Sequence, residues 1–329
     1  MRCPVKFRLP DIDSSRRKFL RQTCAALGGA TIVGGQFWEN PSVTMAADQT
    51  PEGDIDAHSH IWTRDIEQYP LAPGQMLDDL APSSFTAEEL LALVRPLGVG
   101  RVVLIQHKPY HGLDNSYITD SIALYPGVFS AVACIDAEGP DPAADMLRLQ
   151  EQGVRGFRIL ASEGGAERWK DSKGMREMWG TGAAVGLAMC PLINPQDLSL
   201  VDEMCRQFRK TPVVIDHFAR IGADGEIREA DVKALADLAK YPGVHVKISA
   251  YYALGRKKAP YTDLIPMIQR MLNAYGAERL MWASDSPYQV VPPHTYEDSL
   301  TLIRERMPGL SATQREWLLR KTAEKVYFA

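Results

Sequence analysis

The sequence contains few cysteines, and their spacing argues against a disulfide framework. Of the five cysteines in 329 residues, Cys3 and Cys24 lie near the N-terminus, and Cys134, Cys190 and Cys205 are scattered through the remainder. No two of them form a C-x-x-C pair, and the three later cysteines are an odd set. We therefore interpret these three as small, buried apolar groups.

The sequence also lacks an excess of charge of either sign. It has 37 lysines and arginines against 41 aspartates and glutamates, for a formal net charge of −4, and no basic stripe with interleaved aromatic residues. Such a stripe is typical of nucleic-acid binding, so we expect no nucleic-acid partner. No apolar run reaches the roughly 20 residues that a membrane-spanning helix needs, so we expect no stable membrane anchor.

The N-terminal segment has the pattern of an export signal. Ser15-Arg16-Arg17-Lys18-Phe19-Leu20 is a twin-arginine motif, a modestly apolar, glycine-rich stretch follows, and small residues at 44–47 offer a peptidase site. We predict that residues 1–46 are a signal peptide that binds the twin-arginine export machinery and is removed on export to the periplasm or beyond. The alternative is a disordered or helical tail.

The remaining residues, 47–329, alternate short β-branched runs with helical patterns. Several runs are continuously apolar, as strands covered on both faces are. Helical patterns occur at 87–94, 142–152, 196–208, 229–240 and 261–275. The predicted strands are Asp54–His58, Arg101–Gln106, Phe129–Ile135, Val154–Leu160, Leu187–Ile193, Val213–His217, Val244–Ser249 and Leu280–Ser284.

Eight such alternations predict an α/β fold, a (β/α)₈ TIM barrel, as a single domain. Neither a linker-like shift in composition nor an internal repeat indicates a second domain. The main alternative is an open doubly wound sheet, but no G-x-G-x-x-G follows the first predicted strand. The sequence leaves a homo-oligomer open.

Polar residues close most of the predicted strands, at the end of the barrel where such folds carry their active sites. Strand alternation places residues two apart on one face. It predicts that His58 and His60 face away from Ile55, Ala57 and Ser59. It also groups His217 with Val213 and Ile215, and Asp285 with Met281 and Ala283. The polar residues at or near these ends are His58, His60, Gln106, Arg158, Asn194, His217, Lys247 and Asp285.

Three imidazoles and one carboxylate are suitable ligands for zinc or another divalent ion. The predicted metal ligands are His58, His60, His217 and Asp285. A polar loop that also contains His107 adds further candidates, so the predicted substrate-binding residues are Arg158, Gln106, Tyr110, His111, Asn115 and Lys247.

Each of these residues also has a structural alternative. Asp285 could cap the turn that follows it, because Asp-Ser-Pro is a common turn opener. His217 could be a packed histidine bonded to a carbonyl group. Arg158 and Lys247 could be paired with acidic neighbours inside the barrel, because buried cations need partners.

Three motifs together resemble the amidohydrolase superfamily. They are Asp56-x-His58-x-His60, Asp216-His217 and Ser284-Asp285-Ser286-Pro287, in that order along the chain. The pattern is most similar to the amidohydrolase-related branch, whose TIM-barrel hydrolases resemble dicarboxylate and sugar lactonases. The resemblance extends over essentially the whole of residues 47–329.

The resemblance implies roles for individual residues. Asp285 matches the carboxylate that deprotonates the attacking water, and His217 is the second predicted catalytic residue. Arg158 matches a basic residue that contacts substrate, and it stands where a bridging lysine or glutamate would support two metals. Asn194 stands where many metal-dependent members have a histidine. The resemblance therefore implies one divalent metal, with zinc as first choice, or metal-independent catalysis.

The expected activity is hydrolysis of a small molecule, a lactone or similar cyclic ester. One alternative is a metal-dependent, non-oxidative decarboxylase of the same superfamily. A second alternative is an exported binding protein that retains the barrel without catalysis. Hydrolytic turnover would indicate the hydrolase, and release of carbon dioxide would indicate the decarboxylase. Ligand binding without turnover would indicate the binding protein.

Overall fold

Eight parallel strands pair in chain order and form the frame of the molecule. The computed structural model describes residues 51–161 and 168–329. The predicted signal peptide at 1–46 therefore lies outside the described residues and stays a prediction. The strands are β1 (Asp54–Ser59), β2 (Val99–Ile105), β3 (Phe129–Ala133), β4 (Val154–Leu160), β5 (Ala188–Leu192), β6 (Val213–Ile215), β7 (Val244–Ile248) and β8 (Leu280–Trp282).

Hydrogen bonds between the first strand and the segment after β8 close the sheet into a barrel. The backbone N–H of Asp285 donates to the carbonyl oxygen of His58 at 2.8 Å. The N–H of His60 donates to the carbonyl oxygen of Ser286, also at 2.8 Å. An open doubly wound sheet has no such closure. The predicted TIM barrel is confirmed, and the open sheet is wrong.

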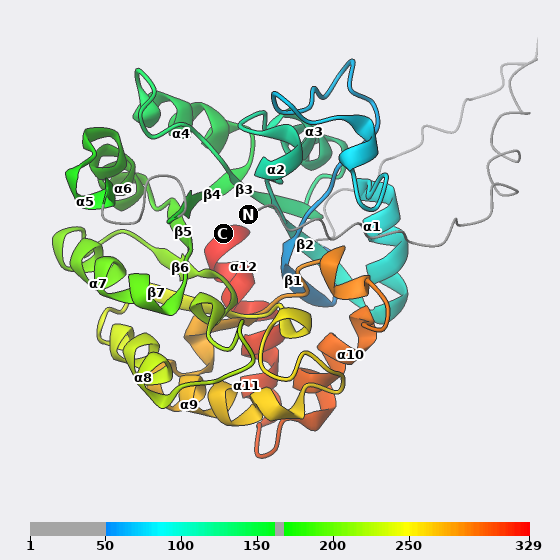
Figure 1. Cartoon of the computed structure of the whole chain (residues 1–329), viewed down its shortest axis with the longest axis vertical. Helices are drawn as coiled ribbons and strands as arrows, with labels where there is room; N and C mark the ends of the chain where they lie inside the picture. The colour runs from blue at the N-terminus through cyan, green and yellow to red at the C-terminus, as the bar shows by residue number, and fades with distance from the viewer. Residues whose placement is uncertain (1–50, 162–167) are drawn as a thin grey trace, which may run out of the picture. The chain divides into compact units, whose positions relative to one another are not determined.

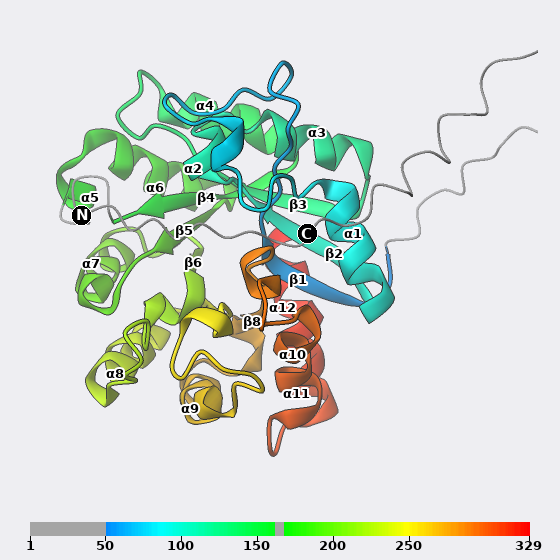
Figure 2. The same ribbon diagram turned by 45° about the vertical axis from the view of Figure 1, so that its right-hand side comes forward.

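Helices cover the outside of the strands (Figures 1 and 2). Their starts follow local sequence rules: Thr86 and Glu89 form a capping box, and Asp141 caps the helix that begins at Pro142. The helices are α1 (Ala87–Val94), α2 (Lys108–His111), α3 (Ser116–Leu124), α4 (Pro142–Glu151), α5 (Arg168–Asp171), α6 (Lys173–Val185), α7 (Leu198–Gln207), α8 (Glu229–Asp237), α9 (Ile265–Tyr275), α10 (Tyr296–Thr301), α11 (Ala312–Glu316) and α12 (Thr322–Tyr327).

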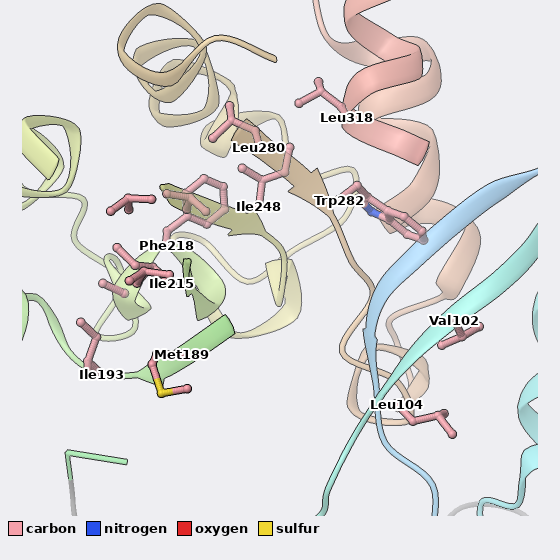
Figure 3. Close-up of a cluster of buried hydrophobic side chains, with 14 of the residues drawn as sticks. Val102, Leu104, Met189, Ile193, Ile215, Phe218, Ile248, Leu280, Trp282 and Leu318 are labelled. Atoms are coloured by element: carbon pink, nitrogen blue, oxygen red, sulfur yellow. The ribbon is translucent and has the colours of Figure 1, made fainter. Parts of the chain in front are cut away.

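Two apolar clusters lie on the two sides of the strands. The outer cluster joins strand residues such as Val102, Ile215 and Trp282, drawn in Figure 3, to Leu90 and Trp179 of the surrounding helices. The inner cluster fills the barrel and contains Ile55, Ala57, Val103, Ile105, Val132, Ala188, Cys190, Val214, Met281, Ala283, Ala323 and Tyr327. Membership of one cluster or the other shows which way each strand residue points.

The C-terminal helix α12 contributes to the barrel interior (Figure 1). The ring of Tyr327 is buried, and its centroid lies 5.4 Å from the Nζ atom of Lys247. Its hydroxyl lies 3.6 Å from the Sγ atom of Cys190. The end of the chain thus packs directly beneath polar residues of the barrel.

The predicted strands agree closely with the structure, whereas several helices were not predicted. β3, β6 and β8 each end two residues earlier than predicted. After β6 and β8 the backbone reaches positive φ at His217 (52°) and at Asp285 (67°). Helix α6 contains glycines, which lower helix propensity. One of them, Gly182, lies too close to the carbonyl oxygen of Leu187 for a side chain. No helix in the described part of the chain is long and apolar enough to cross a membrane.

The carboxylate of Asp56 fastens the barrel closure. Asp56 is fully buried. It accepts hydrogen bonds from the backbone N–H groups of His58 (3.1 Å) and Ser284 (2.9 Å). It also accepts from the hydroxyls of Ser59 (2.9 Å), Ser284 (2.5 Å) and Tyr296 (2.8 Å). One side chain therefore joins β1, the segment after β8 and α10.

We expect Asp56→Asn to destabilise the fold by about 3 kcal/mol or more, because the new amide leaves buried donors without an acceptor. Asp54→Asn is the matched control on the same strand. The partner of Asp54 is the partly exposed Arg304, so its loss should cost about 1 kcal/mol or less. Urea unfolding measures both changes. Equal losses in the two variants would contradict the role given to Asp56.

Candidate active site

A cavity opens at the C-terminal ends of the strands. Its volume of about 450 Å³ suits a small-molecule ligand. Three predicted metal ligands line it, and the fourth, His58, is fully buried against them. The polar side chains in its wall are His60, His107, Lys108, Arg158, His217, Arg220, Tyr252, Asp285 and Tyr288.

Three imidazoles use Nδ1 to fix their orientation and direct Nε2 toward Asp285. The Nε2 atoms of His58 and His60 each lie 3.4 Å from Oδ1 of Asp285, and that of His217 lies 3.8 Å from Oδ2. A carbonyl partner at Nδ1, as in His60, accepts a hydrogen bond and so places the proton on Nδ1 and leaves the Nε2 lone pair free. The Nδ1 partners are the carbonyl of Ile105 for His60 (2.9 Å) and the hydroxyl of Ser249 for His217 (2.8 Å). Nδ1 of His58 lies 3.3 Å from the carboxylate of Asp216 and 3.3 Å from Nζ of Lys247.

Asp285 is held ionised at the centre of this arrangement. Burial alone would raise the pKa of its carboxyl, but the facing imidazoles of His217, His60 and His58 outweigh burial and hold the pKa well below its usual range. The hydroxyl of Tyr252 donates a hydrogen bond to Oδ2 at 2.8 Å. Burial lowers the pKa of His217 to about 4, so its imidazole is neutral near pH 7. The site thus combines a carboxylate with the neutral imidazole of His217.

His58 reaches the site because β1 departs from regular alternation. Ile55 and Ala57 belong to the inner cluster, so simple alternation would turn His58 outward together with Asp56. The pairing of β1 with β2 shifts register between Asp56 and Ser59, and the Ser59 hydroxyl meets the Asp56 carboxylate. The prediction that His58 faces away from Ile55 and Ala57 is therefore wrong, although the side chain does reach the mouth.

His217 reaches the site through a left-handed turn. Val213 and Ile215 belong to the outer cluster, so Asp216 is the residue whose alternation points inward. The backbone then adopts positive φ over the turn Asp216–Arg220, from His217 to Arg220 (52°, 50°, 53° and 57°). The prediction that His217 shares a face with Val213 and Ile215 is wrong. The turn, rather than alternation, brings its imidazole beside Asp285.

A buried cluster of charges lies beneath the cavity. The carboxylate of Asp216 lies 3.1 Å from Nζ of Lys247 and 3.4 Å from Nη2 of Arg158. Lys247 is fully buried and does not line the cavity, so the structure contradicts its prediction as a substrate-binding residue. The structural alternative stated for Lys247, pairing with an acidic neighbour inside the barrel, is confirmed, and that neighbour is Asp216. Arg158 has the same partner, but it also lines the cavity.

Four other predicted substrate-binding residues lie outside the cavity wall. Gln106 donates to the carbonyls of Gly112 and Asp114, and Asn115 bonds to the backbone of Cys134 and Leu113. The Tyr110 hydroxyl accepts from the N–H of Ala81, and Nδ1 of His111 bonds to the carbonyl of Pro70. These side chains stabilise the loops, because their polar atoms form hydrogen bonds with backbone groups of the loops. Direct substrate contact by Gln106, Tyr110, His111 and Asn115 is therefore not supported.

The sequence analysis missed four polar residues of the cavity wall, Lys108, Arg220, Tyr252 and Tyr288. Tyr252 contacts Asp285, Tyr288 bonds to Nε2 of His107 at 2.6 Å, and Arg220 ends the left-handed turn. None belongs to a spacing pattern that marks a site. The one available signal was their position, since each follows a predicted strand by a few residues on the side where TIM barrels carry their sites.

The donor set fits one divalent metal ion. His58, His217 and Asp285 each offer a ligand atom, and these atoms lie within 4.8 Å of one another. Imidazoles with fixed Nδ1 groups beside a carboxylate are typical of zinc-type sites. Arg158 competes for one of these ligands, because its Nη2 lies 3.3 Å from Nε2 of His58. One lone pair cannot bind a metal and accept this hydrogen bond at once.

Comparisons with known proteins agree with this geometry. Residues 55–329 match the family described as Amidohydrolase. The chain is similar to an L-fucono-1,5-lactonase of Burkholderia ambifaria, at 29% identity over 244 residues, 73% of this chain and 82% of that protein. It is also similar to a 4-sulfomuconolactone hydrolase of Rhizobium radiobacter, at 25% identity over 238 residues, 72% of this chain and 77% of that protein.

A solved structure shares the fold. It is an amidohydrolase from Burkholderia multivorans with bound zinc, with a TM-score of 0.71 and 20% identity. The match covers 84% of this chain and 99% of that chain. At this identity the likeness concerns the barrel itself.

We expect Arg158→Met to tighten zinc binding about tenfold, because it frees the Nε2 lone pair of His58 and removes a nearby positive charge. Arg155→Met is the control: Arg155 lies on the same strand, but its guanidinium bonds to backbone carbonyls of Gln150 and Val154. Competition with a chromogenic chelator measures the affinity of each purified protein. Unchanged zinc affinity in Arg158→Met would show that the guanidinium and the metal do not compete.

Proposed function

The chain belongs to the amidohydrolase family of hydrolases, and we propose that it opens a lactone or similar cyclic ester with Asp285 as the base. The observation that carries the proposal is the convergence of three imidazole Nε2 atoms on one ionised, buried carboxylate at the mouth of the barrel. The lactonase and lactone hydrolase named among its relatives support the choice of substrate.

The first step is deprotonation of water by Asp285. The hydroxyl of Tyr252 engages Oδ2, which fixes the rotation of the carboxylate and presents Oδ1 to the cavity. Because the pKa of Asp285 is held low, its carboxylate is ionised throughout the neutral range. The water oxygen then forms a bond to the lactone carbonyl carbon, and its proton moves to Asp285.

The second step is collapse of the tetrahedral oxyanion. The guanidinium of Arg158 lies against His58 and is held by Asp216, so a fixed positive charge already faces the developing oxyanion. The ring C–O bond breaks, and Asp285 returns its proton to the leaving alkoxide. His217 is the alternative donor once its Nε2 atom has taken this proton from Asp285. The sum is one lactone plus one water giving one hydroxy acid.

We also propose that one divalent ion, with zinc as first choice, can bind to His58, His217 and Asp285, with His60 adjoining. The barrel of the Burkholderia multivorans relative was found with zinc bound, which supports this choice. When present, such an ion supplies Lewis acidity toward the substrate carbonyl. Without the ion, Arg158 and the imidazoles polarise the substrate carbonyl.

Asp285→Asn should lower the rate of lactone opening by at least about a thousandfold, because the amide cannot accept the proton of water. Ring opening across a panel of lactones can be followed with a pH indicator, and circular dichroism checks that the variant is folded. Asp224→Asn removes a carboxylate that is exposed and paired with Arg228, so its rate should be unchanged.

Other outcomes of the same assay identify the alternatives. Release of carbon dioxide from a carboxylated substrate, without incorporation of solvent oxygen, would indicate a decarboxylase. Tight ligand binding without turnover, unaffected in Asp285→Asn, would indicate a binding protein. Full lactonase activity in Asp285→Asn would remove this residue from the role of base.

We propose in addition that residues 1–46 direct export through the twin-arginine route, on the evidence of Arg16 and Arg17 and the segment after them. In bacterial cells that have this route, the full chain should accumulate in the periplasm in a shortened form. Replacing both arginines by lysine should retain it in the cytoplasm at full length. Cell fractionation measures this, and export of the lysine variant would contradict the proposal.

A further inference from the structure

The charged groups that line the cavity are unequally partnered. Arg158 is paired with Asp216, and Asp285 is engaged by Tyr252 and the imidazoles. Arg220 differs: within residues 51–161 and 168–329, its guanidinium has neither a hydrogen bond nor an ion pair. The side chain is exposed to solvent and lines the same cavity as His217 and Asp285. Its positive charge therefore faces the space in which a ligand would lie.

The backbone turn that places Arg220 beside the reacting groups is strained. Four successive residues other than glycine, from His217 to Arg220, have positive φ, a backbone conformation that is strained for residues with a side chain. Phe218 and Ala219, both fully buried, pack into the outer cluster and hold the turn in place. A turn of three residues aligns positions three apart, so His217 and Arg220 both face the cavity while the two residues between them face the core.

We propose that Arg220 binds an anionic substituent of the substrate, and that the substrate is therefore a lactone bearing a carboxylate or sulfonate rather than a neutral lactone. This inference rests on the lactonase function proposed above. The ring carbonyl lies at Asp285 and Arg158, and the oxyanion group lies at Arg220. A planar guanidinium can bind both oxygens of such a group at once.

A purely structural role for Arg220 would leave a different signature. A structural arginine bonds to a carboxylate or to backbone carbonyls, as Arg279 does with the carbonyls of Tyr275, Ala239 and Tyr241. A surface arginine unrelated to the site would not line the same cavity as His217 and Asp285. The proposed role predicts that the effect of losing Arg220 depends on the charge of the ligand.

The test compares a butenolide carrying a carboxymethyl group with its methyl ester, which has the same ring but no charge. We expect the wild-type protein to prefer the acid in kcat/KM for ring opening. Arg220→Gln should lose about 10- to 100-fold on the acid and change little on the ester, because a charge-assisted bond is lost only with the acid. Arg220→Lys should retain part of the preference.

Arg228→Gln is the matched control, since it removes one positive charge nearby from a residue paired with Asp224 and Glu226 outside the cavity wall. It should leave both rates unchanged. Equal losses on acid and ester in Arg220→Gln, or a wild-type protein that treats the two alike, would overturn the inference while leaving the lactonase function in place.

A binding measurement separates this inference from the proposed function. Calorimetric titration with glutarate and with its dimethyl ester requires no turnover. If the wild-type protein opens neither lactone but binds glutarate at least about tenfold more tightly than Arg220→Gln does, the lactonase function fails and the anion site stands. If it opens neither lactone and binds glutarate no better than Arg220→Gln does, both are wrong.

Discussion

The buried carboxylate of Asp56 is the constraint on which the site geometry depends. β8 is only three residues long (Leu280–Trp282), so it offers few backbone bonds with which to meet β1. Asp56 supplies the missing acceptors, because it takes the N–H of His58 and the N–H and hydroxyl of Ser284. These donors belong to His58 itself and to the residue before Asp285. The same bonds that close the barrel therefore set the 3.4 Å approach of His58 to Asp285.

Beneath the site, one buried carboxylate is paired with two cations before any ligand arrives. Asp216 is a fully buried anion, and Lys247 and Arg158 lie within 3.4 Å of it. A buried charge pair is costly to break, so Arg158 keeps its position. Its guanidinium consequently needs no reorganisation when negative charge develops on a substrate, which is the condition for strong electrostatic stabilisation. Arg220 has no partner in this cluster, and its charge remains available to a ligand.

The sequence predicted the barrel and the identity of the central residues better than it predicted how they reach the site. β-branched runs and strand-end polar residues located β1 to β8, because both follow from local composition. The inward turn of His58 was not predictable, since it depends on a register shift against β2. Gln106 and Asn115 were misassigned because their side chains form hydrogen bonds with backbone carbonyl groups. These carbonyl groups are brought beside them only when the chain folds, so the sequence did not reveal the bonds. Tyr252 lacked any pattern and is recognised by its contact with Asp285 alone.

Three departures from regular backbone geometry lie at the residues that act. β1 shifts register just before His58, β6 ends in a left-handed turn at His217, and Asp285 itself has a φ of 67°. Strain of this kind persists only where surrounding structure fixes it. Here the contacts that fix it can be named. Hydrogen bonds to Asp56 hold the backbone at His58 and at Ser284, the residue before Asp285. The buried side chains of Phe218 and Ala219 hold the turn at His217. Glycine at Ala219 would relieve the backbone, but it would also let His217 and Arg220 leave the face they share. The strained turn therefore places the imidazole of His217 and the guanidinium of Arg220 so that both face the same ligand.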